Sequence, residues 1–426
     1  MRRVVFSNSS RNVMTGCKRY YYFYNILNLR PEVENTNFRV GGVWHTIKQR
    51  FYEGYRSYDW LYKDGVIKII PGRETCGEEI EPRLERISKE VLREKTVTIE
   101  DSVRELWMDK ERPLLESMAG TYPSMARRIL DEYDIFGVEI PFRLKISRYR
   151  DRYMVTWLPL LSDERPATEY VGVMDLGLKK KETNRVFFGE NKSTSENSYE
   201  AYLPTVDSNY QSVGYACAVS SLCDAMGLGD PIGGVYIASR KKIPTAPHLN
   251  QCTKCKGKGV RKLKKEGEFI CELCDGSGKG ALSLSKIETT QRVIDKVLKD
   301  AGHLQKDHYV FFWDDYEKWR SRCVSDAWHF KFLKVHSHFD MRMWLEDTLE
   351  VLSQYREWER RPKSEKRYTR SWDFTKCKKC EFRPVCLNGD SNYINQFFKR
   401  VEPSEYPFEF NERFSKFAEE YFGVRI

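Results

Sequence analysis

The stretch that decides the fold is Val171–Lys192, VGVMDLGLKKKETNRVFFGENK. It contains two short runs rich in β-branched and aromatic residues, VGVMD and VFFGENK, which are typical of strands with a turn between them. Residues two apart in a strand share a face, so Glu190 and Lys192 point the same way and Asn191 points back. If the strands pair as a hairpin, Asp175 comes alongside Glu190.

Two carboxylates at one place repel each other unless they bind a divalent cation. Mg²⁺ or Mn²⁺ held by Asp175 and Glu190 could orient a phosphodiester and activate a water molecule. Lys192 beside the ion could polarise or deprotonate that water, or stabilise the charged transition state. Such a trio also arises by chance in charged chains, and a surface hairpin with a salt bridge is the alternative that these residues alone leave open.

Residues that flank this stretch extend the pattern. Gln211 and Tyr215 lie four apart, on one face of a predicted helix, where they could contact nucleic acid or brace the lysine. Ordinary helix packing is the alternative for Tyr215. Upstream, His45 follows Gly41-Gly42-Val-Trp, and a neutral imidazole there could be a further metal ligand. A purely structural histidine is the competing interpretation.

The rest of the chain predicts a mixed α/β core. The runs GVEIPFRLKI, YMVTWLPLL and GGVYIASRKK read as further strands, and residues 199–227 read as one helix. Residues 1–60, 60–135 and the chain from Leu282 onward read as helical. We predict an N-terminal helical lobe (1–135), a core (136–243), a Pro-, Gly-, Lys- and Cys-rich insertion (244–281) and a C-terminal helical part (282–426).

Composition narrows the function classes. The chain has 426 residues, of which 40 % are hydrophobic, and this excludes a wholly disordered protein. No apolar run approaches the ~20 residues of a membrane-spanning helix, so no membrane partner is expected. The net charge of +10 permits a polyanionic partner, although a solvated basic surface explains it equally well. The N-terminus has no apolar signal-peptide core.

Seven of the twelve cysteines fall into two clusters. In a chain without a secretion signal, Cys-x-x-Cys pairs indicate metal sites rather than disulfides, so we expect a reducing, cytoplasmic compartment. The first cluster has the spacing of a zinc site and comprises Cys252, Cys255, Cys271 and Cys274. The second cluster supplies three thiolates, Cys377, Cys380 and Cys386, which could bind zinc with a fourth partner.

The first cluster lies in two similar octets, CTKCKGKG and CELCDGSG, whose glycines allow tight turns around a metal. They resemble half of the cysteine-rich domain of DnaJ chaperones, which implies one Zn²⁺ instead of two. Between Cys252 and Gly280 there are eight Lys or Arg residues and four acids. This excess suggests contact with phosphates, and a solvated loop or a protein contact is the alternative.

The order of several short motifs resembles the PD-(D/E)XK nucleases of the RecB type, in particular their iron–sulfur branch, which includes CRISPR adaptation nucleases, AddB-like nuclease domains and phage exonucleases. The resemblance covers roughly residues 6–240 and 282–392. It rests on Cys17-Lys-Arg-Tyr, Gly41-x3-His45, Glu139-x-Pro, Gly172-x2-Asp175, Glu190-x-Lys192, Gln211-x3-Tyr215 and the C-terminal three-cysteine cluster.

This resemblance implies a restriction-endonuclease-like fold, that is, a mixed central sheet flanked by helices, with a helical N-terminal lobe and the zinc-binding insertion. It implies that the Mg²⁺ or Mn²⁺ ligands are His45, Asp175, Glu190 and the backbone carbonyl of Asn191. Lys192 matches the catalytic lysine, Gln211 and Tyr215 match the fourth motif, and Glu139 matches an acid of less defined role. The iron–sulfur ligands would be Cys17, Cys377, Cys380 and Cys386, holding a [4Fe–4S] cluster that clamps the chain ends together.

The implied activity is that of a metal-dependent deoxyribonuclease, an exonuclease acting on DNA ends or single strands in recombination, repair or phage replication. It would work in the cytoplasm of a bacterium or of a phage-infected host, with a recombination or replication protein as a further partner. No helicase motif such as GxxxxGK[ST] occurs. The alternatives are a non-catalytic nucleic-acid-binding or chaperone-like adaptor that uses the zinc module, and a structure-specific endonuclease.

Overall fold

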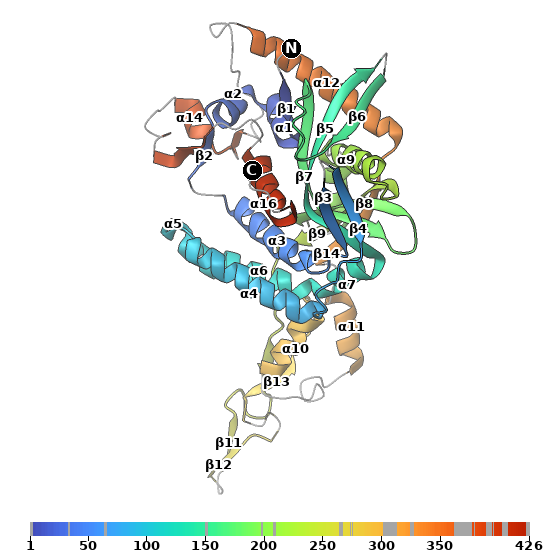
Figure 1. Cartoon of the computed structure of the whole chain (residues 1–426). Coiled ribbons are helices and arrows are strands. Elements are labelled where there is room, and N and C mark those ends of the chain that lie inside the picture. The colour runs from blue at the N-terminus through green and yellow to red at the C-terminus, as the bar shows by residue number, and fades with distance from the viewer. Residues whose placement is uncertain are drawn as a thin grey trace.

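The computed structural model (Figure 1) describes residues 3–32, 35–63, 66–149, 152–196, 199–207, 210–263, 267–272, 274, 276–300, 313–323, 328–361, 377–378, 380–388, 394, 396–402 and 408–422.

A mixed sheet forms the centre of the molecule and has seven strands within the described residues. Its order is β14-β9-β8-β7-β5-β6, and β1 pairs with β7 outside this path. β1 and β7 are parallel, as are β8 and β9, and the other neighbours are antiparallel. The strands are β1 (Val4–Phe6), β5 (Tyr133–Tyr149), β6 (Arg152–Leu158), β7 (Thr168–Lys180), β8 (Arg185–Thr194), β9 (Asp230–Arg240) and β14 (His329–Val335).

Alternation along the central strands divides the apolar side chains between the two faces of the sheet. In β8, Phe187 joins one buried cluster, while Val186 and Phe188 join the other. Because both faces are covered, the central strands contain almost continuous apolar runs. The helices of the first cluster are α3 (Thr36–Glu53), α4 (Ile80–Thr98), α6 (Arg112–Thr121) and α7 (Pro123–Glu132). Those of the second are α9 (Tyr210–Met226), α12 (His338–Arg360) and α16 (Phe408–Phe422).

Smaller elements surround this core. On the N-terminal side they are α1 (Asn8–Gly16), α2 (Lys18–Tyr21), η1 (Tyr22–Ile26), β2 (Leu29–Pro31), β3 (Tyr58–Lys63), β4 (Val66–Pro71), α5 (Asp101–Leu106), η2 (Trp107–Glu111) and α8 (Tyr199–Asp207). After β9 they are β10 (Leu249–Gln251), β11 (Val260–Leu263), β12 (Gly267–Ile270), β13 (Lys279–Leu282), α10 (Gln291–Asp300), α11 (Trp313–Cys323), α14 (Arg383–Asn388) and β15 (Phe398–Arg400).

The predicted fold class, a mixed sheet flanked by helices, is confirmed. Three details differ from the sequence prediction, because β1, the β3–β4 hairpin and β14 lie in segments predicted to be helical. β1 and β14 are short strands whose pairing partners lie far away in the sequence, at β7 and β9. The predicted helix over residues 199–227 is divided between α8 and α9. The four domain boundaries remain predictions.

Strands β10 to β13 form an arm that extends away from the central sheet (Figure 1). At its base, Leu282 packs with Ile294 and Leu298 of α10 and with Tyr316 and Trp319 of α11. Among the described residues, no helix is both long and apolar enough to cross a membrane.

Candidate functional site

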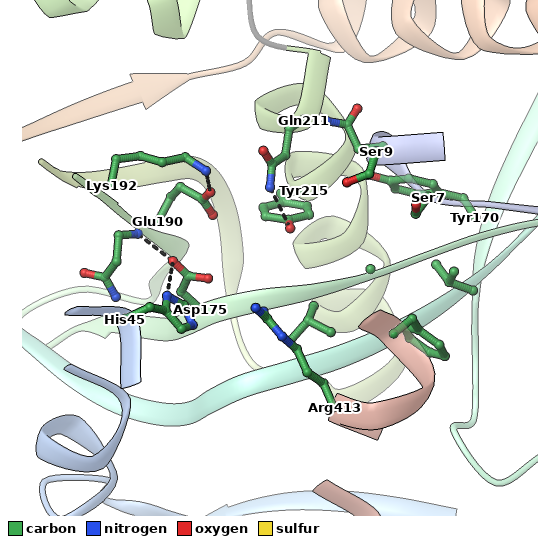
Figure 2. Close-up of a pocket in the computed structure, with 16 residues that line it drawn as sticks. Ser7, Ser9, His45, Tyr170, Asp175, Glu190, Lys192, Gln211, Tyr215 and Arg413 are labelled. Atoms are coloured by element: carbon green, nitrogen blue, oxygen red, sulfur yellow. Dashed lines mark hydrogen bonds and ion pairs between the residues drawn. The ribbon is translucent and has the colours of Figure 1, made fainter. Parts of the chain in front are cut away.

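The hairpin predicted from the sequence forms between β7 and β8. Leu176 pairs with Gly189 across the two strands, so Asp175 and Glu190 follow side by side. A Cβ atom on Gly189 would lie 2.8 Å from the Cβ of Leu176, which explains why glycine precedes the glutamate. The Oδ2 atom of Asp175 accepts a hydrogen bond of 2.7 Å from the backbone N–H of Asn191. Both carboxylates border a cavity of about 230 Å³ (Figure 2).

Helix α3 brings His45 to the same cavity. Its Nδ1 atom lies 3.7 Å from Oδ2 of Asp175, and its Nε2 atom contacts a carboxylate oxygen of Glu139. One ligand atom from each of His45, Glu139 and Asp175 falls within 4.8 Å of the others, a spacing that one cation could bridge. All three residues were candidates from the sequence. The sequence assigned Glu139 no defined role, whereas the structure places it in contact with His45. Glu190 lies outside this group of three.

Glu139 has an unusual backbone conformation. Its φ is +52°, in the left-handed region that residues other than glycine rarely adopt. It sits in the middle of β5, opposite the strand that carries Asp175. Strain of this kind costs on the order of 1–3 kcal/mol and tends to persist at functional sites, where the surroundings determine the conformation.

Without a bound cation, burial disfavours the charged carboxylate form of Glu190. Burial raises its pKa to about 7, with a further contribution from Asp175, although the ammonium group of Lys192 opposes the shift. One carboxylate oxygen pairs with Lys192, and the other is buried without a hydrogen-bond partner among the described residues. An unsatisfied buried oxygen beside a second carboxylate is a donor set that a hard divalent cation fits.

Lys192 supplies a positive charge at the wall of the cavity. Burial alone would lower its pKa, but the carboxylates of Glu190 and Asp175 outweigh burial and raise the pKa above its usual range. Without a bound metal ion, Lys192 is therefore charged and suited to stabilising negative charge. The pKa of His45 is also raised. Burial lowers it, but the carboxylates of Asp175 and Glu139 raise it by more than burial lowers it.

Gln211 and Tyr215 both line the cavity from α9, as their spacing predicts (Figure 2). The amide Nε2 of Gln211 donates a hydrogen bond of 2.8 Å to the hydroxyl of Tyr215. The ring of Tyr215 packs edge-on against Phe142 and Phe188. This packing fixes the ring and leaves the amide of Gln211 at the cavity wall, where it could contact a substrate.

Three features of the site had no signal in the sequence. Arg413 of α16 reaches the cavity, and its Nη1 atom lies 3.1 Å from Oε2 of Glu139. Ser7, Asn8 and Ser9, at the start of α1, form another part of the wall. These segments lie more than a hundred residues from the hairpin, so only the folded chain relates them.

Lys48 is the third such feature. It lies one helical turn after His45 and is 1 % exposed, and its Nζ atom has no hydrogen-bond partner among the described residues. The Nζ atom is 5.4 Å from the ring centre of Trp44 and 5.5 Å from that of Tyr122. Burial lowers the pKa of Lys48 to about 7, although Asp175 and Glu190 counteract the shift.

The four cysteines of the insertion meet at one point. Their sulfur atoms lie within 4.8 Å of one another, with 3.8 Å between Cys252 and Cys271 and 3.6 Å between Cys255 and Cys274. Four sulfurs at about 2.3 Å from a Zn²⁺ ion form a tetrahedron with edges of about 3.8 Å. The sulfur positions therefore fit a single tetrahedral ion.

The two octets fold alike around this point. The backbone N–H of Cys252 bonds to the carbonyl of Gly278, and that of Cys271 bonds to the carbonyl of Gly259. The second and fourth residues after each CxxC pair are glycines with positive φ angles, namely Gly257, Gly259, Gly276 and Gly278. A Cβ on Gly259 would lie 2.2 Å from a backbone oxygen, so the repeated glycines are required by close packing. Lys264, Lys265, Glu266 and Asp275, which enter the charge count of this segment, lie outside the described residues.

The second set of cysteines lies where the chain ends meet. The Sγ atom of Cys17 accepts a hydrogen bond from the backbone N–H of Tyr20 and caps α2. Burial raises the pKa of Cys380 to about 11, and Cys17 and Cys386 are near enough to contribute. The four sulfur atoms of the insertion lie within 4.8 Å of one another. Those of this second set, all in described residues, do not. A four-iron cluster would hold its ligands farther apart than a single ion does.

The family model of the PD-(D/E)XK nuclease superfamily matches residues 5–387. The match includes β7, β8, α3 and α9, which provide most of the cavity wall. No curated protein matches the chain.

Proposed function

The chain belongs to the PD-(D/E)XK nuclease superfamily, and we propose that it is a Mg²⁺- or Mn²⁺-dependent deoxyribonuclease that acts as an exonuclease on DNA ends. The observation that carries this proposal is the cavity in which Asp175, Glu190 and Lys192 meet. Restriction-type hydrolysis needs carboxylates for a metal ion and a cation for the phosphate, and the cavity supplies both.

We propose that His45, Asp175, Glu190 and the carbonyl of Asn191 hold the metal ion, with Glu139 as a further ligand. When bound, the ion would lower the pKa of a water molecule and neutralise charge on the phosphate. Lys192 would stabilise the charge that develops on the phosphate oxygens. Gln211 and Tyr215 would position the scissile phosphate, and Arg413 would orient Glu139 while offering charge to the DNA backbone.

We further propose that the insertion binds one Zn²⁺ and that Cys17, Cys377, Cys380 and Cys386 bind a [4Fe–4S] cluster. Lysine and arginine residues of the insertion would contact DNA phosphates outside the cavity. Clustered thiolates that bind metal suit a reducing compartment, so we place the protein in the cytoplasm of a bacterium or of a phage-infected host. Its roles would be recombination, repair or phage replication, alongside a recombination or replication protein.

The test is cleavage of end-labelled linear DNA by anaerobically purified protein, with Mn²⁺ or with EDTA. We expect cleavage with Mn²⁺ and none with EDTA. The cleavage rate of Lys192→Ala should be lower by at least about 100-fold, because removal of one group that stabilises the transition state has an effect of this size. Lys89→Ala is the matched control, because Lys89 is an exposed lysine on α4 that pairs with Glu85, away from the cavity. Full activity of Lys192→Ala would contradict the site assignment.

Two further readouts separate the alternatives. An exonuclease leaves covalently closed circular DNA intact, so cutting of the circle would favour a structure-specific endonuclease. Mn²⁺ should also raise the melting temperature of the wild type more than that of Asp175→Asn, since a ligand that binds only the folded state stabilises it. Metal-independent DNA binding without cleavage would favour the non-catalytic adaptor.

A further inference from the structure

A second cavity, of about 340 Å³, opens between the N-terminal helices and α12. Its seven lining residues include three aromatic rings and one cation, and none of them is acidic. They are Thr15, Lys18, Tyr21, Val351, Gln354, Tyr355 and Trp358. A volume of this size is typical of a small-molecule site with an apolar wall and a few polar groups at its edge.

The aromatic wall is preformed. The hydroxyl of Tyr21 donates a hydrogen bond of 2.8 Å to that of Tyr355, and the two rings meet edge to face. Trp358 lies one turn further along α12, with its ring centre 5.9 Å from that of Tyr355. Lys18, Thr15 and Gln354 are exposed at the rim. Flat rings inside and hydrogen-bonding groups at the rim are what an unpaired nucleobase requires.

Helix α1 connects this cavity to the catalytic one. Asn8 and Ser9 at its first turn line the catalytic cavity, and Thr15 at its last turn lines the second. Seven residues of α-helix span about 10 Å. In a DNA strand with stacked bases, successive phosphates are about 3.4 Å apart along the strand, so about 10 Å corresponds to about three nucleotides. An extended strand covers the same distance with fewer nucleotides.

The N-terminal segment that contributes residues to both cavities has a basic composition. Residues 1–31 contain six Arg or Lys residues and no Asp or Glu. Lys18 lies at the rim of the second cavity, and Arg413 lies at the catalytic one. A strand that follows α1 therefore meets positive charge at both ends of its path.

We infer that the cavity formed by Tyr21, Tyr355 and Trp358 holds an unpaired base of the substrate strand, up to about three nucleotides from the scissile phosphate. This inference rests on the proposed nuclease function and adds a property to it. A base inside an aromatic pocket cannot remain paired, so the DNA must be single-stranded there. The enzyme would then act on single strands or on frayed ends.

The first experiment maps the base in the full-length chain carrying Lys192→Ala. Single-stranded oligonucleotides each carry one 2-aminopurine, moved one position at a time from the end. We expect strong quenching at one or two positions within about three nucleotides of the cleavage site mapped with the wild type. Adding Tyr355→Ala should remove this quenching, while Tyr62→Ala, which changes an exposed tyrosine of β3, should leave it. The same quenching profile in Tyr355→Ala would overturn the inference.

The second experiment measures kinetics in otherwise wild-type protein. Tyr355→Ala should raise KM for long single strands about 5- to 100-fold, as the loss of one stacked base does, without a matching loss of kcat. Lys18→Ala changes only an exposed side chain, so it tests the cavity even if Tyr355→Ala folds poorly. Substrates too short to reach the cavity should be cut equally by wild type and variants.

These outcomes also distinguish the two proposals. Wild-type protein that cuts DNA, with KM unchanged in both Tyr355→Ala and Lys18→Ala, would overturn the base pocket and leave the nuclease function standing. Wild-type protein that fails to cut DNA but shows quenching that depends on Tyr355 would support the pocket and contradict the nuclease. Equal quenching in all variants, without cleavage, would contradict both.

Discussion

Lys48 is a buried cation close enough to the carboxylates of Asp175 and Glu190 for them to affect its pKa. Its ammonium group is buried against Trp44 and Tyr122, on the helix that carries His45, and it forms no hydrogen bond with the described residues. A buried cation without a hydrogen-bonded partner destabilises a fold. The carboxylates of Asp175 and Glu190 compensate in part, because they raise its pKa while burial lowers it.

We predict that Lys48→Met raises the stability of the metal-free protein by about 1–4 kcal/mol at pH 7, as replacement of other buried charges has done. The unfolded lysine keeps its proton up to about pH 10.5, whereas the folded one loses it near pH 7. Wild-type stability therefore rises with pH between these values, and the advantage of the variant should shrink. Melting temperatures at pH 7 and pH 9 measure both effects.

Lys89→Met, at an exposed position on α4, is the control for the change of side-chain type. It should melt within a degree or two of the wild type at both pH values, since surface changes have small effects. A Lys48→Met protein that melts below the wild type at pH 7 would show that the ammonium group makes a stabilising contact.

The sequence located the residues of the site that lie within short motifs. Asp175, Glu190 and Lys192 share a hairpin, so the two-residue period of a strand was enough to bring them together. Arg413 and Lys48 were not predictable in this way. Arg413 reaches the cavity only through the packing of the last helix, and nothing in the sequence pattern distinguishes Lys48 from a surface lysine.

The arm that carries Cys252, Cys255, Cys271 and Cys274 has little apolar packing of its own among the described residues. The buried cluster between the β10–β13 pair and the β11–β12 hairpin consists of these four cysteines alone. Another small apolar cluster, around Trp319, packs at the base of the arm. A unit this small needs a metal ion to remain folded.

We predict that Cys255→Ser removes the one bound zinc ion per chain and unfolds the arm, while the main melting transition shifts by only a few degrees. The central sheet packs through other residues, so its stability should not depend on this ion. Zinc content by mass spectrometry and the melting curve give the two readouts. Cys76→Ser, at an exposed cysteine outside both clusters, is the control.

Collapse of the main transition in Cys255→Ser would show that the arm and the core fold as one unit. A zinc content unchanged from the wild type would instead contradict the assignment of the four thiolates.

The sequence predicted the strands of the core better than those at its edges. β7 and β8 have long apolar runs, which buried strands require. In β14 the alternation of Phe330 and Phe332 with the polar residues His329 and Lys331 is the strand signal that the helical prediction for residues 282–426 overlooks. β1 has only three residues, and its strand form depends on β7, which is more than a hundred and sixty residues away.

Segments from near the two ends of the chain pack against each other. β2 pairs with β15, and the hydroxyl of Tyr20 donates a hydrogen bond of 2.6 Å to Glu381. Phe382 packs against Tyr20 and Phe23 in the same cluster. Cys17 and Cys380 lie beside these contacts, so a bound cluster would close a loop of several hundred residues.

We predict that Cys380→Ser bleaches the brown colour of the anaerobically purified protein and lowers its stability. Cross-links that close long loops contribute about 2–5 kcal/mol, so a loss of this order is expected. The visible absorbance, the iron content and denaturant unfolding curves provide the measurements. Cys76→Ser again serves as the control, and a Cys380→Ser protein that keeps full iron content would contradict the cluster.

The wall of the cavity that contains Asp175 and Glu190 is assembled from segments that are synthesised at very different times. Asp175 and Glu190 leave the ribosome more than two hundred residues before Arg413 and Phe410, which border the same cavity. Tyr421, on the same last helix, bonds to Glu53 across 368 residues of sequence. Domains fold as their residues emerge, so the half-made polypeptide carries its carboxylates in an open, unfinished cleft. Translation thus delays the completion of this cavity until α16 has been made.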